Sequence, residues 1–447
     1  MNGRDVLPRL SRPFAFSAAL FSPDSLTRAF ANIRPTGVQA VLRNARFSKL
    51  EYTLNRSSLS SLSDPTRGVW SLLRLQVRTK ARSRDYEIRI GRGILSEAGL
   101  VARSCLGSQS RRVAIISNDK VFSLYGTAVL QSLKASGFAV HPWLIDDGER
   151  HKSLRAVEKV LGFLSDAGIE RSDGVLALGG GIVGDVVGFA AAIYLRGVPF
   201  IQVPTTLLAQ IDSSVGGKTG VNLPAGKNLV GSFHQPAAVV VDIETLASLP
   251  ARELVAGFCE CVKQGAVSSP NLFKQTTGFL KDFNSQGALI TTQLAQLIAS
   301  HCAFKASIVA ADEREELTRR DARSRRILNF GHTIAHALEA VTKYRQFRHG
   351  EAVGHGMLVA GQLSKNLGLL EPSELELLSQ AISLCGSLPS ARNLNEGGVI
   401  EAITHDKKRA SGYVQWVLLE GIGRPRIVDG KEISPLLLRK SIREALR

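Results

Sequence analysis

Between residues 85 and 245, short apolar runs rich in β-branched residues alternate with segments of helical period. The runs over Arg112–Ser117 and Val175–Leu178 place apolar side chains at consecutive positions, so both faces of each strand are apolar. A strand of this kind must be covered on both faces. The alternation therefore predicts a parallel β-sheet covered by helices, an α/β fold.

Beyond Thr245 the pattern changes to long segments rich in leucine and alanine. Their helical period predicts helices over 250–267, 288–311, 331–342, 350–369 and 373–386, with one late strand-like run at Tyr413–Leu419. We therefore predict three parts. These are a basic, Ser/Arg-rich and disordered extension over 1–80, an α/β domain over 81–244 and a mainly α-helical domain over 245–447.

The net charge of +17 is concentrated near the start of the chain. Residues 1–80 hold 13 basic and 4 acidic residues, so the other 367 residues carry only +8. A Ser/Arg-rich, acid-poor beginning resembles an organelle transit peptide; a disordered extension or an upstream start codon are the alternatives. Because aromatic residues make up only 6% and much of the basic excess lies outside the fold, we expect no nucleic-acid partner.

The five cysteines include no CxxC pair, which favours a reducing compartment. The longest apolar run, Val186–Leu195, has about ten residues, whereas a membrane-spanning helix needs about 20. We therefore expect a cytoplasmic protein with no membrane partner, or a plastid protein if residues 1–80 are a transit peptide.

A glycine loop, GGGIVGD over Gly179–Asp185, follows one predicted strand and opens a helix. It matches GxGxxG, in which glycines allow close backbone approach and the helix N-terminus attracts a pyrophosphate. The acid that binds ribose about twenty residues later is missing, since that position falls near Val203 and Pro204. The loop indicates nucleotide binding in a Rossmann-like domain; a tight strand–helix crossing is the alternative.

A second stretch rich in glycine and lysine runs over 205–228. Its GKT sequence resembles the end of a P-loop, but Asp212 stands where the first glycine should be. What remains is Asp212, Lys218, Lys227 and Asn228 on turns flanked by glycine. Such a set fits an anionic substrate better than a structural loop.

Histidines cluster between residues 332 and 355. His332 and His336 are four residues apart on a predicted helix, so both project from one face, and His349 begins the next helical segment. A divalent metal with an open coordination position suits this pattern, whereas histidines satisfied within helices are the alternative. The nearby Lys305, Arg325 and Asn329 are hard to explain as core residues.

With these motifs in order, the chain resembles the 3-dehydroquinate synthase family from about residue 85 to 425. The resemblance is carried by DGERHK (147–152), GGGIVGD, YLRG (194–197), PTTLLAQIDSSVGGKTG (204–220), GKN (226–228), ECVK (260–263), NFGHTIAH (329–336), HGE (349–351) and DKK (406–408). It implies an NAD-binding α/β domain followed by a helical domain.

The resemblance also implies a reaction. The substrate is 3-deoxy-D-arabino-heptulosonate 7-phosphate, and the products are 3-dehydroquinate and phosphate. The C5 hydroxyl is oxidised with NAD, phosphate leaves by elimination, the ketone is reduced again and the ring closes by an intramolecular aldol step. This is the second step of the shikimate pathway.

The site residues that the resemblance implies fall into four groups. The metal ligands are Glu260, His332 and His349, with zinc as the expected ion and Co²⁺ as an alternative. His336 then takes a proton-transfer role, alongside the catalytic residues Asp212, Lys218 and Lys263. Substrate-binding residues are Arg196, Asn228, Lys305, Arg325, Asn329 and one of Lys407 and Lys408. Cofactor-binding residues are Asn118, Asp119, Lys120, Glu149, Lys152, Gly180, Gly181, Ile182, Asp185, Thr205, Thr206, Lys227, Thr245, Leu246, Ala247 and Ser248.

Some points depart from the family pattern or stay open. Ala335 replaces a glycine, and Cys259 and Cys261 flank Glu260, where we expect them to pack away from the metal. Glu149 is our candidate for binding the ribose hydroxyls. Other sugar-phosphate cyclases and glycerol dehydrogenases are the competing assignments, against which Arg325 and the lysines argue. We expect a homodimer in which Arg196 reaches the partner's site.

Overall fold

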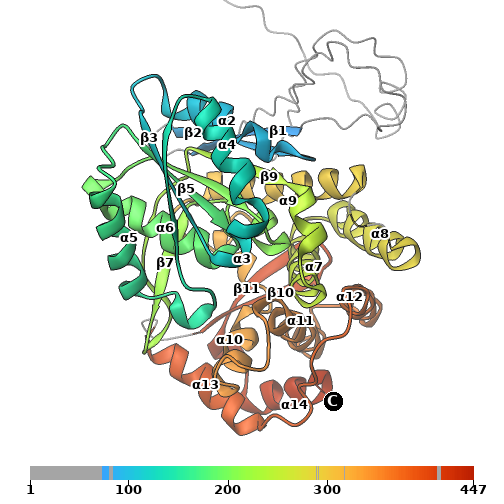
Figure 1. Ribbon diagram of the computed structural model, residues 1–447. Coiled ribbons are helices and arrows are strands. Elements are labelled where there is room, and N and C mark those ends of the chain that lie inside the picture. The colour runs from blue at the N-terminus through green and yellow to red at the C-terminus, as the bar shows by residue number, and fades with distance from the viewer. Residues whose placement is uncertain are drawn as a thin grey trace, which may run out of the picture. The chain divides into compact units, whose positions relative to one another are not determined.

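The computed structural model describes residues 73–79, 84–287, 289, 291–316, 318–409 and 414–446. The extension predicted over 1–80 thus lies outside the described residues, except for strand β1 (Leu73–Thr79). All of the described residues belong to one compact unit. Figure 1 shows a sheet with its helices from blue to green and a helical part from yellow to red.

Within the described residues, seven strands form one sheet in the order β1-β2-β9-β6-β5-β3-β4. The bounds are β1 Leu73–Thr79, β2 Arg84–Gly91, β3 Arg112–Ser117, β4 Ala139–Leu144, β5 Gly174–Gly179, β6 Phe200–Pro204 and β9 Ala238–Asp242. From β2 to β4 every neighbouring pair is parallel. The predicted parallel sheet is confirmed.

Strand β1 corrects the predicted start of the fold. It pairs antiparallel with β2, so residues that we assigned to the extension form an edge strand. The segment reads LRLQVRT, in which apolar residues alternate with polar ones at the period of a strand. The surrounding basic, serine-rich composition obscured this short pattern.

Helices cover both faces of the sheet, as predicted from the apolar strands. Ala114 and Ile116 of β3 pack with α5 (Leu154–Asp166) and α6 (Gly181–Ile193). Their neighbours Val113 and Ile115 point the other way, toward α2 (Ala98–Leu106) and α4 (Thr127–Ala135). Consecutive residues of one strand therefore lie in two separate apolar clusters.

Two further strands form a hairpin where we predicted only turns. Strands β7 (Lys218–Leu223) and β8 (Gly226–Phe233) pair antiparallel. A Cβ atom on Gly220 would lie only 2.6 Å from the carbonyl oxygen of Val230, so glycine permits this close pairing. The glycines that suggested turns thus act within strands.

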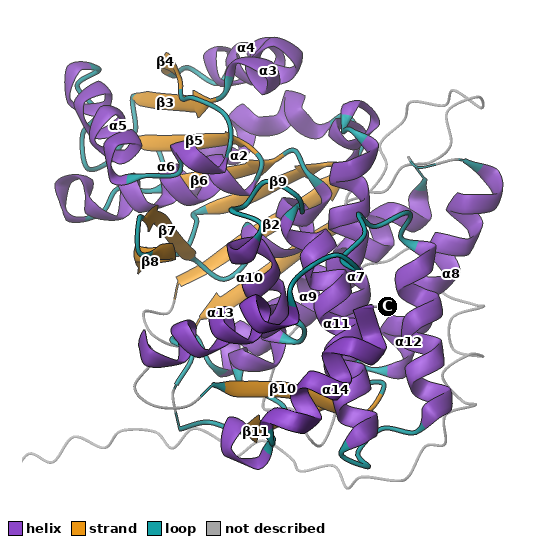
Figure 2. Ribbon diagram, turned by 90° about the horizontal axis from the view of Figure 1, so that it is seen from below, coloured by secondary structure: helices purple, strands orange, loops and turns teal. Residues whose placement is uncertain are grey.

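The helical part follows the sheet and lies beside it (Figure 2). Its helices are α7 Ala251–Ser268, α8 Pro270–Gln286, α9 Thr292–Ala311, α10 His332–Val341, α11 His349–Asn366, α12 Pro372–Leu384, α13 Glu396–Arg409 and α14 Pro435–Leu446. A small sheet pairs β10 (Gln415–Gly421) with β11 (Arg424–Asp429). All five predicted helices and the late strand are present, whereas α8, α13, α14 and β11 were not predicted.

One apolar cluster joins the two parts. Ile88 and Ile90 of β2 and Val239 and Val241 of β9 belong to the same buried cluster as the helices from α7 onward. The domain boundary at 244/245 stays a prediction, although the change from sheet to long helices occurs there.

Helix α9 has the length and mean hydropathy of a membrane span, which our sequence analysis overlooked. More than half of its most apolar window, 56%, is buried inside the protein, as in a core helix. It also carries the buried His301 and Lys305.

Candidate active site

The nucleotide-binding candidates gather where parallel strands of the sheet end. The glycine loop follows β5, Thr205 and Thr206 follow β6, and Asn118 follows β3. The chain runs from β3 to β4 on one side and returns to β5 on the other, so β3 and β5 flank a switch point. Nucleotides bind outside the carboxyl ends of strands at such a point.

The glycine loop is packed tightly against its surroundings. Gly180 precedes α6 and Gly181 is its first residue. A Cβ atom on Gly180 would lie 3.0 Å from the Thr206 methyl group, and one on Gly181 would lie 3.1 Å from the Ser213 hydroxyl. Larger residues would therefore close the space in front of the helix N-terminus.

Lys152 links the glycine-loop helix to the hairpin. Its Nζ atom lies 2.5 Å from a carboxylate oxygen of Asp185 and donates to the side chain of Asn228 at 2.6 Å. Glu149 lies 3.6 Å from Lys227 and accepts from the side chain of Asn222. Burial favours the protonated form of Glu149, but Lys227 and Lys152 outweigh it and lower the pKa of that carboxyl.

The other cofactor candidates are less uniform. Asn118 caps the short helix α3 (Asp119–Val121), which contains Asp119 and Lys120, and Ile182 lies on α6. Residues 245–248 follow β9, but the side chains of Thr245 and Leu246 are buried, whereas Ala247 and Ser248 are exposed. Thr245 and Leu246 are therefore enclosed by the protein, and the Thr245 backbone oxygen accepts a hydrogen bond from the Tyr125 hydroxyl.

The three predicted metal ligands come together from three helices. Glu260 lies on α7, His332 begins α10 and His349 begins α11. The Nε2 atoms of His332 and His349 lie 3.9 Å and 3.7 Å from Oε1 of Glu260. One ligand atom from each residue lies within 4.8 Å of the other two. The three residues thus lie together in the fold, and their role as metal ligands stays a prediction.

The donor set fits a divalent metal ion. Glu260 is fully buried, and among the described residues its Oε1 atom has no hydrogen-bond partner. Burial lowers the pKa of His332 well below its ordinary value, and the Lys263 charge lowers it further. A buried carboxylate oxygen facing two imidazole nitrogens is a common set for zinc or cobalt.

Two glycines allow the three helices to approach closely. A Cβ atom on Gly350 would lie 2.5 Å from the carbonyl carbon of Ala256 on α7. One on Gly356 would lie 2.9 Å from the carbonyl carbon of Gly331, directly before α10. Helix α11 therefore contacts both of the other ligand-bearing helices through glycine.

Cys259 and Cys261 lie on either side of Glu260 along α7 and are buried in the apolar cluster. Both therefore act as small packing residues, and their direction relative to the metal candidates stays a prediction. Burial raises the pKa of the Cys261 thiol well above its ordinary value, so this thiol is not a reactive group.

A buried charge network adjoins the metal candidates. Lys263 lies 2.6 Å from Oε2 of Glu260 and 3.8 Å from Asp212, and Lys305 pairs with Asp212. Burial would raise the pKa of Asp212, but the two lysines outweigh it and hold the pKa well below its usual range. Asp212 is therefore a carboxylate whose charge is shared between two ammonium groups.

The predicted anion-binding residues lie at a neighbouring position. Arg325 is buried and donates to the backbone oxygens of Gly216 at 2.8 Å and Glu313 at 2.7 Å. Asn329 donates to the Glu315 carboxylate at 3.2 Å, and Lys218 pairs with the same carboxylate. Glu315 thus contacts two groups that we expect to bind substrate.

The remaining candidates differ in how near they lie to the metal candidates. His336 is exposed, with its ring centroid 5.7 Å from that of His332 and 6.0 Å from that of His349. Arg196 is exposed beyond the far end of α6, about 20 Å along the helix axis from the glycine loop. The side chains of Lys407 and Lys408 on α13 lie outside the described part of the structure.

Glu339 lies beside these candidates, although no sequence motif predicted it. This buried residue lies 3.4 Å from Nδ1 of His349 and 3.0 Å from Nζ of Lys227. Burial favours its protonated form, but His349 and Lys227 lower the pKa of Glu339 to about 2. Its spacing of three residues from His336 and seven from His332 places it on the same helix face, a signal that could have been used.

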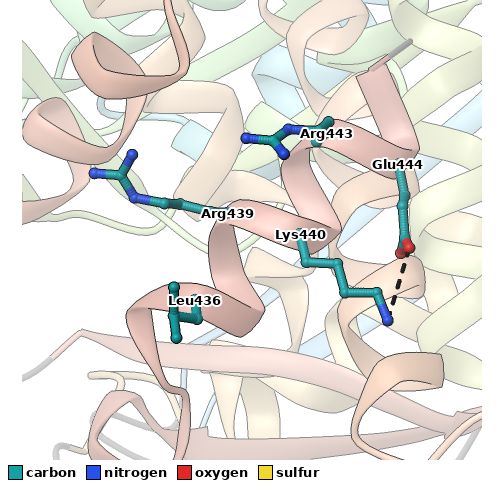
Figure 3. Close-up of a pocket in the computed structure, with 5 residues that line it drawn as sticks. All are labelled: Leu436, Arg439, Lys440, Arg443 and Glu444. Atoms are coloured by element: carbon teal, nitrogen blue, oxygen red, sulfur yellow. Dashed lines mark ion pairs between the residues drawn. The ribbon is translucent and has the colours of Figure 1, made fainter.

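A surface hollow of about 500 Å³ lies elsewhere, on α14 (Figure 3). Leu436, Arg439, Lys440, Arg443 and Glu444 line it. Arg443 pairs with Glu396, and Lys440 lies 3.8 Å from Glu444. None of the predicted site residues lines this hollow.

Comparison with known proteins gives a consistent result. Family models described as 3-dehydroquinate synthase N-terminal and C-terminal match residues 142–256 and 257–409. A 3-dehydroquinate synthase from Geobacter sp. is 40% identical over 367 residues, which is 81% of this chain and 97% of the relative. One from Thermodesulfovibrio yellowstonii is 40% identical over 370 residues, 81% of this chain and 99% of that protein.

Solved structures of sugar-phosphate cyclases are also similar. A 2-deoxy-scyllo-inosose synthase with carbaglucose-6-phosphate, NAD⁺ and Co²⁺ has a TM-score of 0.72 at 25% identity, covering 83% of this chain and all of that one. A 2-epi-5-epi-valiolone synthase from Streptomyces hygroscopicus with NAD⁺ and Zn²⁺ has a TM-score of 0.71 at 28% identity, covering 81% and 95%. The sequence matches, together with the metal-candidate cluster and the glycine loop, show that the chain belongs to the 3-dehydroquinate synthase family.

Proposed function

We propose that the chain converts 3-deoxy-D-arabino-heptulosonate 7-phosphate into 3-dehydroquinate and phosphate, as a phosphate-eliminating carbon–oxygen lyase. The observation that carries the proposal is the position of Glu260, His332 and His349 beside the Asp212–Lys263–Lys305 network. This arrangement offers a metal-binding set, a proton-exchanging network and cationic groups within one region.

Two groups from outside the chain are needed for this chemistry. Glu260, His332 and His349 would hold a divalent ion, which would polarise a substrate oxygen, and NAD, when bound, would accept and return a hydride. The glycine loop, Glu149 and Lys152 are the residues that we expect to hold NAD.

The chain's own residues bind and orient the substrate. Arg325 is fixed by two backbone carbonyls and presents its remaining guanidinium edge to a carboxylate. Lys218 and Asn329 exchange the Glu315 carboxylate for the anionic groups of the substrate. Asp212, held as a carboxylate by Lys263 and Lys305, orients a substrate hydroxyl, and the exposed His336 imidazole moves a proton.

A second candidate is another sugar-phosphate cyclase activity, because the similar solved structures include two such cyclases. Arg325 separates the two possibilities, since a substrate without a carboxylate would leave its buried charge without an anionic partner. A substrate series with and without the carboxylate tests this choice directly.

The experiment incubates the full chain with the heptulosonate phosphate, NAD and zinc, and measures phosphate and 3-dehydroquinate. We expect activity that is lost in Glu260→Gln and after removal of zinc with a chelator. Full activity in the metal-free protein would refute the metal role, and turnover only of substrates lacking the carboxylate would favour the alternative.

The remaining predictions rest on the family resemblance. We propose a homodimer, because Arg196 is exposed and distant from the glycine loop of its own chain. The cytoplasmic location and the small-molecule substrate class are proposed on the same basis.

A further inference from the structure

We infer that Glu339 is a positioning residue that orients the metal-ligand candidate His349 and, through the same carboxylate, the cofactor-binding candidate Lys227. The inference rests on the proposed function for the identity of the two ligands. Glu339 lies on α10 and belongs neither to the predicted metal ligands nor to the predicted cofactor-binding residues, although it contacts one residue of each set.

The two histidines present equivalent atoms to Glu260. His332 directs Nδ1 to the backbone oxygen of Phe330 at 3.3 Å, and His349 directs Nδ1 to the Glu339 carboxylate at 3.4 Å. In each case an acceptor beside Nδ1 places the proton on that nitrogen, which leaves the lone pair on Nε2. Both Nε2 atoms face Glu260.

The acceptors differ in kind. For His332 the acceptor is a backbone carbonyl, which belongs to the fold. For His349 it is a buried side chain, the carboxylate–histidine arrangement that fixes ring orientation and raises the basicity of a metal ligand. Glu339 can therefore be replaced without changing a ligand.

The same carboxylate also holds the hairpin. Lys227 on β8 lies 3.0 Å from Oε1 of Glu339 and 3.6 Å from Glu149, the residue that we expect at the ribose. A continuous series of contacts thus runs from the Glu149 carboxylate through the Lys227 ammonium and the Glu339 carboxylate to the His349 imidazole. Within this series, the Glu339 carboxylate contacts both Lys227 and His349.

A competing interpretation makes Glu339 a ligand itself. His336, Glu339 and His349 also offer ligand atoms within 4.8 Å of one another. This second set uses a glutamate that already pairs with Lys227 and an exposed histidine, whereas Glu260 has an oxygen without a partner among the described residues. The structure favours Glu260 as the ligand and Glu339 as its support.

The test measures zinc affinity by chelator competition and NAD affinity by equilibrium titration of the purified full chain. Glu339→Gln should weaken zinc binding by about 10- to 100-fold while one zinc still binds per chain. It should also weaken NAD binding by about two- to fivefold, because Lys227 loses the nearer of its two carboxylate partners and keeps only Glu149. Lys227→Met should weaken NAD binding alone, because the ion pairs of Lys227 are with Glu149 and Glu339 and not with Glu260, His332 or His349.

Asp173→Asn is the matched control. Asp173 is a buried carboxylate that accepts from the backbone of Glu170, Arg111 and Arg112, away from the site. Asp173→Asn should lower the unfolding temperature of the metal-free protein, because these backbone hydrogen bonds weaken, without changing zinc or NAD affinity.

Three results would overturn the inference. They are unchanged zinc affinity in Glu339→Gln, unchanged NAD affinity in the same variant, or a loss of zinc as complete as in Glu260→Gln, which would make Glu339 a ligand. If the unaltered chain bound no zinc at all, the proposed metal site would fail instead, so the two failures are distinguishable.

Discussion

Replacing Gly350 by alanine should break the metal-ligand cluster without removing any ligand. Gly350 follows His349 on α11 and packs against the backbone of Ala256 on α7, one turn before Glu260. An added Cβ would lie 2.5 Å from the Ala256 carbonyl carbon, whereas ordinary contact begins at 3.4 Å. Because the contacted atoms belong to the Ala256 backbone, they cannot rotate away, and the helices must separate.

The separation is at least about 1 Å, since carbon atoms pack at about 3.5–4.0 Å. Metal-ligand distances tolerate only about 0.2 Å, so we expect zinc affinity to fall by at least about 100-fold. Overpacking of this kind also destabilises proteins by about 1–3 kcal/mol. Chelator competition gives the first quantity, and urea unfolding of the metal-free protein gives the second.

Gly278→Ala on α8 is the matched control. An added Cβ there meets no atom within 4 Å, so alanine should be neutral or stabilising by up to about 1 kcal/mol. If Gly350→Ala bound zinc as tightly as the unaltered chain, the idea that glycine contact sets the ligand spacing would be refuted.

Three further predictions address stability, substrate and cofactor. Burial lowers the pKa of His301 to about 3, so its imidazole stays neutral in the folded chain but takes up a proton near pH 6.5 when unfolded. The free energy of unfolding should therefore fall as the pH drops below 6.5, by about 2–3 kcal/mol at pH 4.5. His301→Gln should remove this part of the pH dependence, which urea titrations at pH 7 and 4.5 measure. In Arg325→Lys, the lysine cannot donate to both the Gly216 and the Glu313 carbonyl oxygens as Arg325 does. The KM for the heptulosonate phosphate should therefore rise by about 10- to 100-fold with NAD affinity retained. An unchanged KM would contradict the role of Arg325 in binding the substrate carboxylate. Gly181→Val should weaken NAD binding at least about tenfold in an equilibrium titration, because its side chain would fill the space beside Ser213, and normal affinity would exclude the loop as the NAD site.

The sequence was sufficient for features that depend on local patterns. Strand β3 and helix α7 follow directly from apolar runs and helical period, and the ligand cluster follows from the family motifs. It was insufficient where distant segments determine the outcome. The hairpin of β7 and β8 is rich in glycine and lysine, and only backbone pairing across the turn makes it a sheet.

Glu339 shows the same limit at the site. In sequence it is an ordinary glutamate on an amphipathic helix, a position usually exposed to water. Its burial depends on Lys227, which lies 112 residues earlier on β8 and supplies the opposite charge. The periodicity of α10 places Glu339 on the face of His332 and His336, but it does not contain the pairing with Lys227.

The shared apolar cluster has a consequence for how this protein can be made or altered. During synthesis, β2 and β9 leave the ribosome before α7. The side chains of Ile88, Ile90, Val239 and Val241 are therefore exposed to solvent until the later helices pack against them. A fragment ending near residue 244 would carry that uncovered face permanently and would be prone to aggregate. For the same reason, the α/β part of the chain cannot be exchanged between relatives as an independent unit. A chimaera must also include the helices from α7 onward, because they bury the apolar face of β2 and β9.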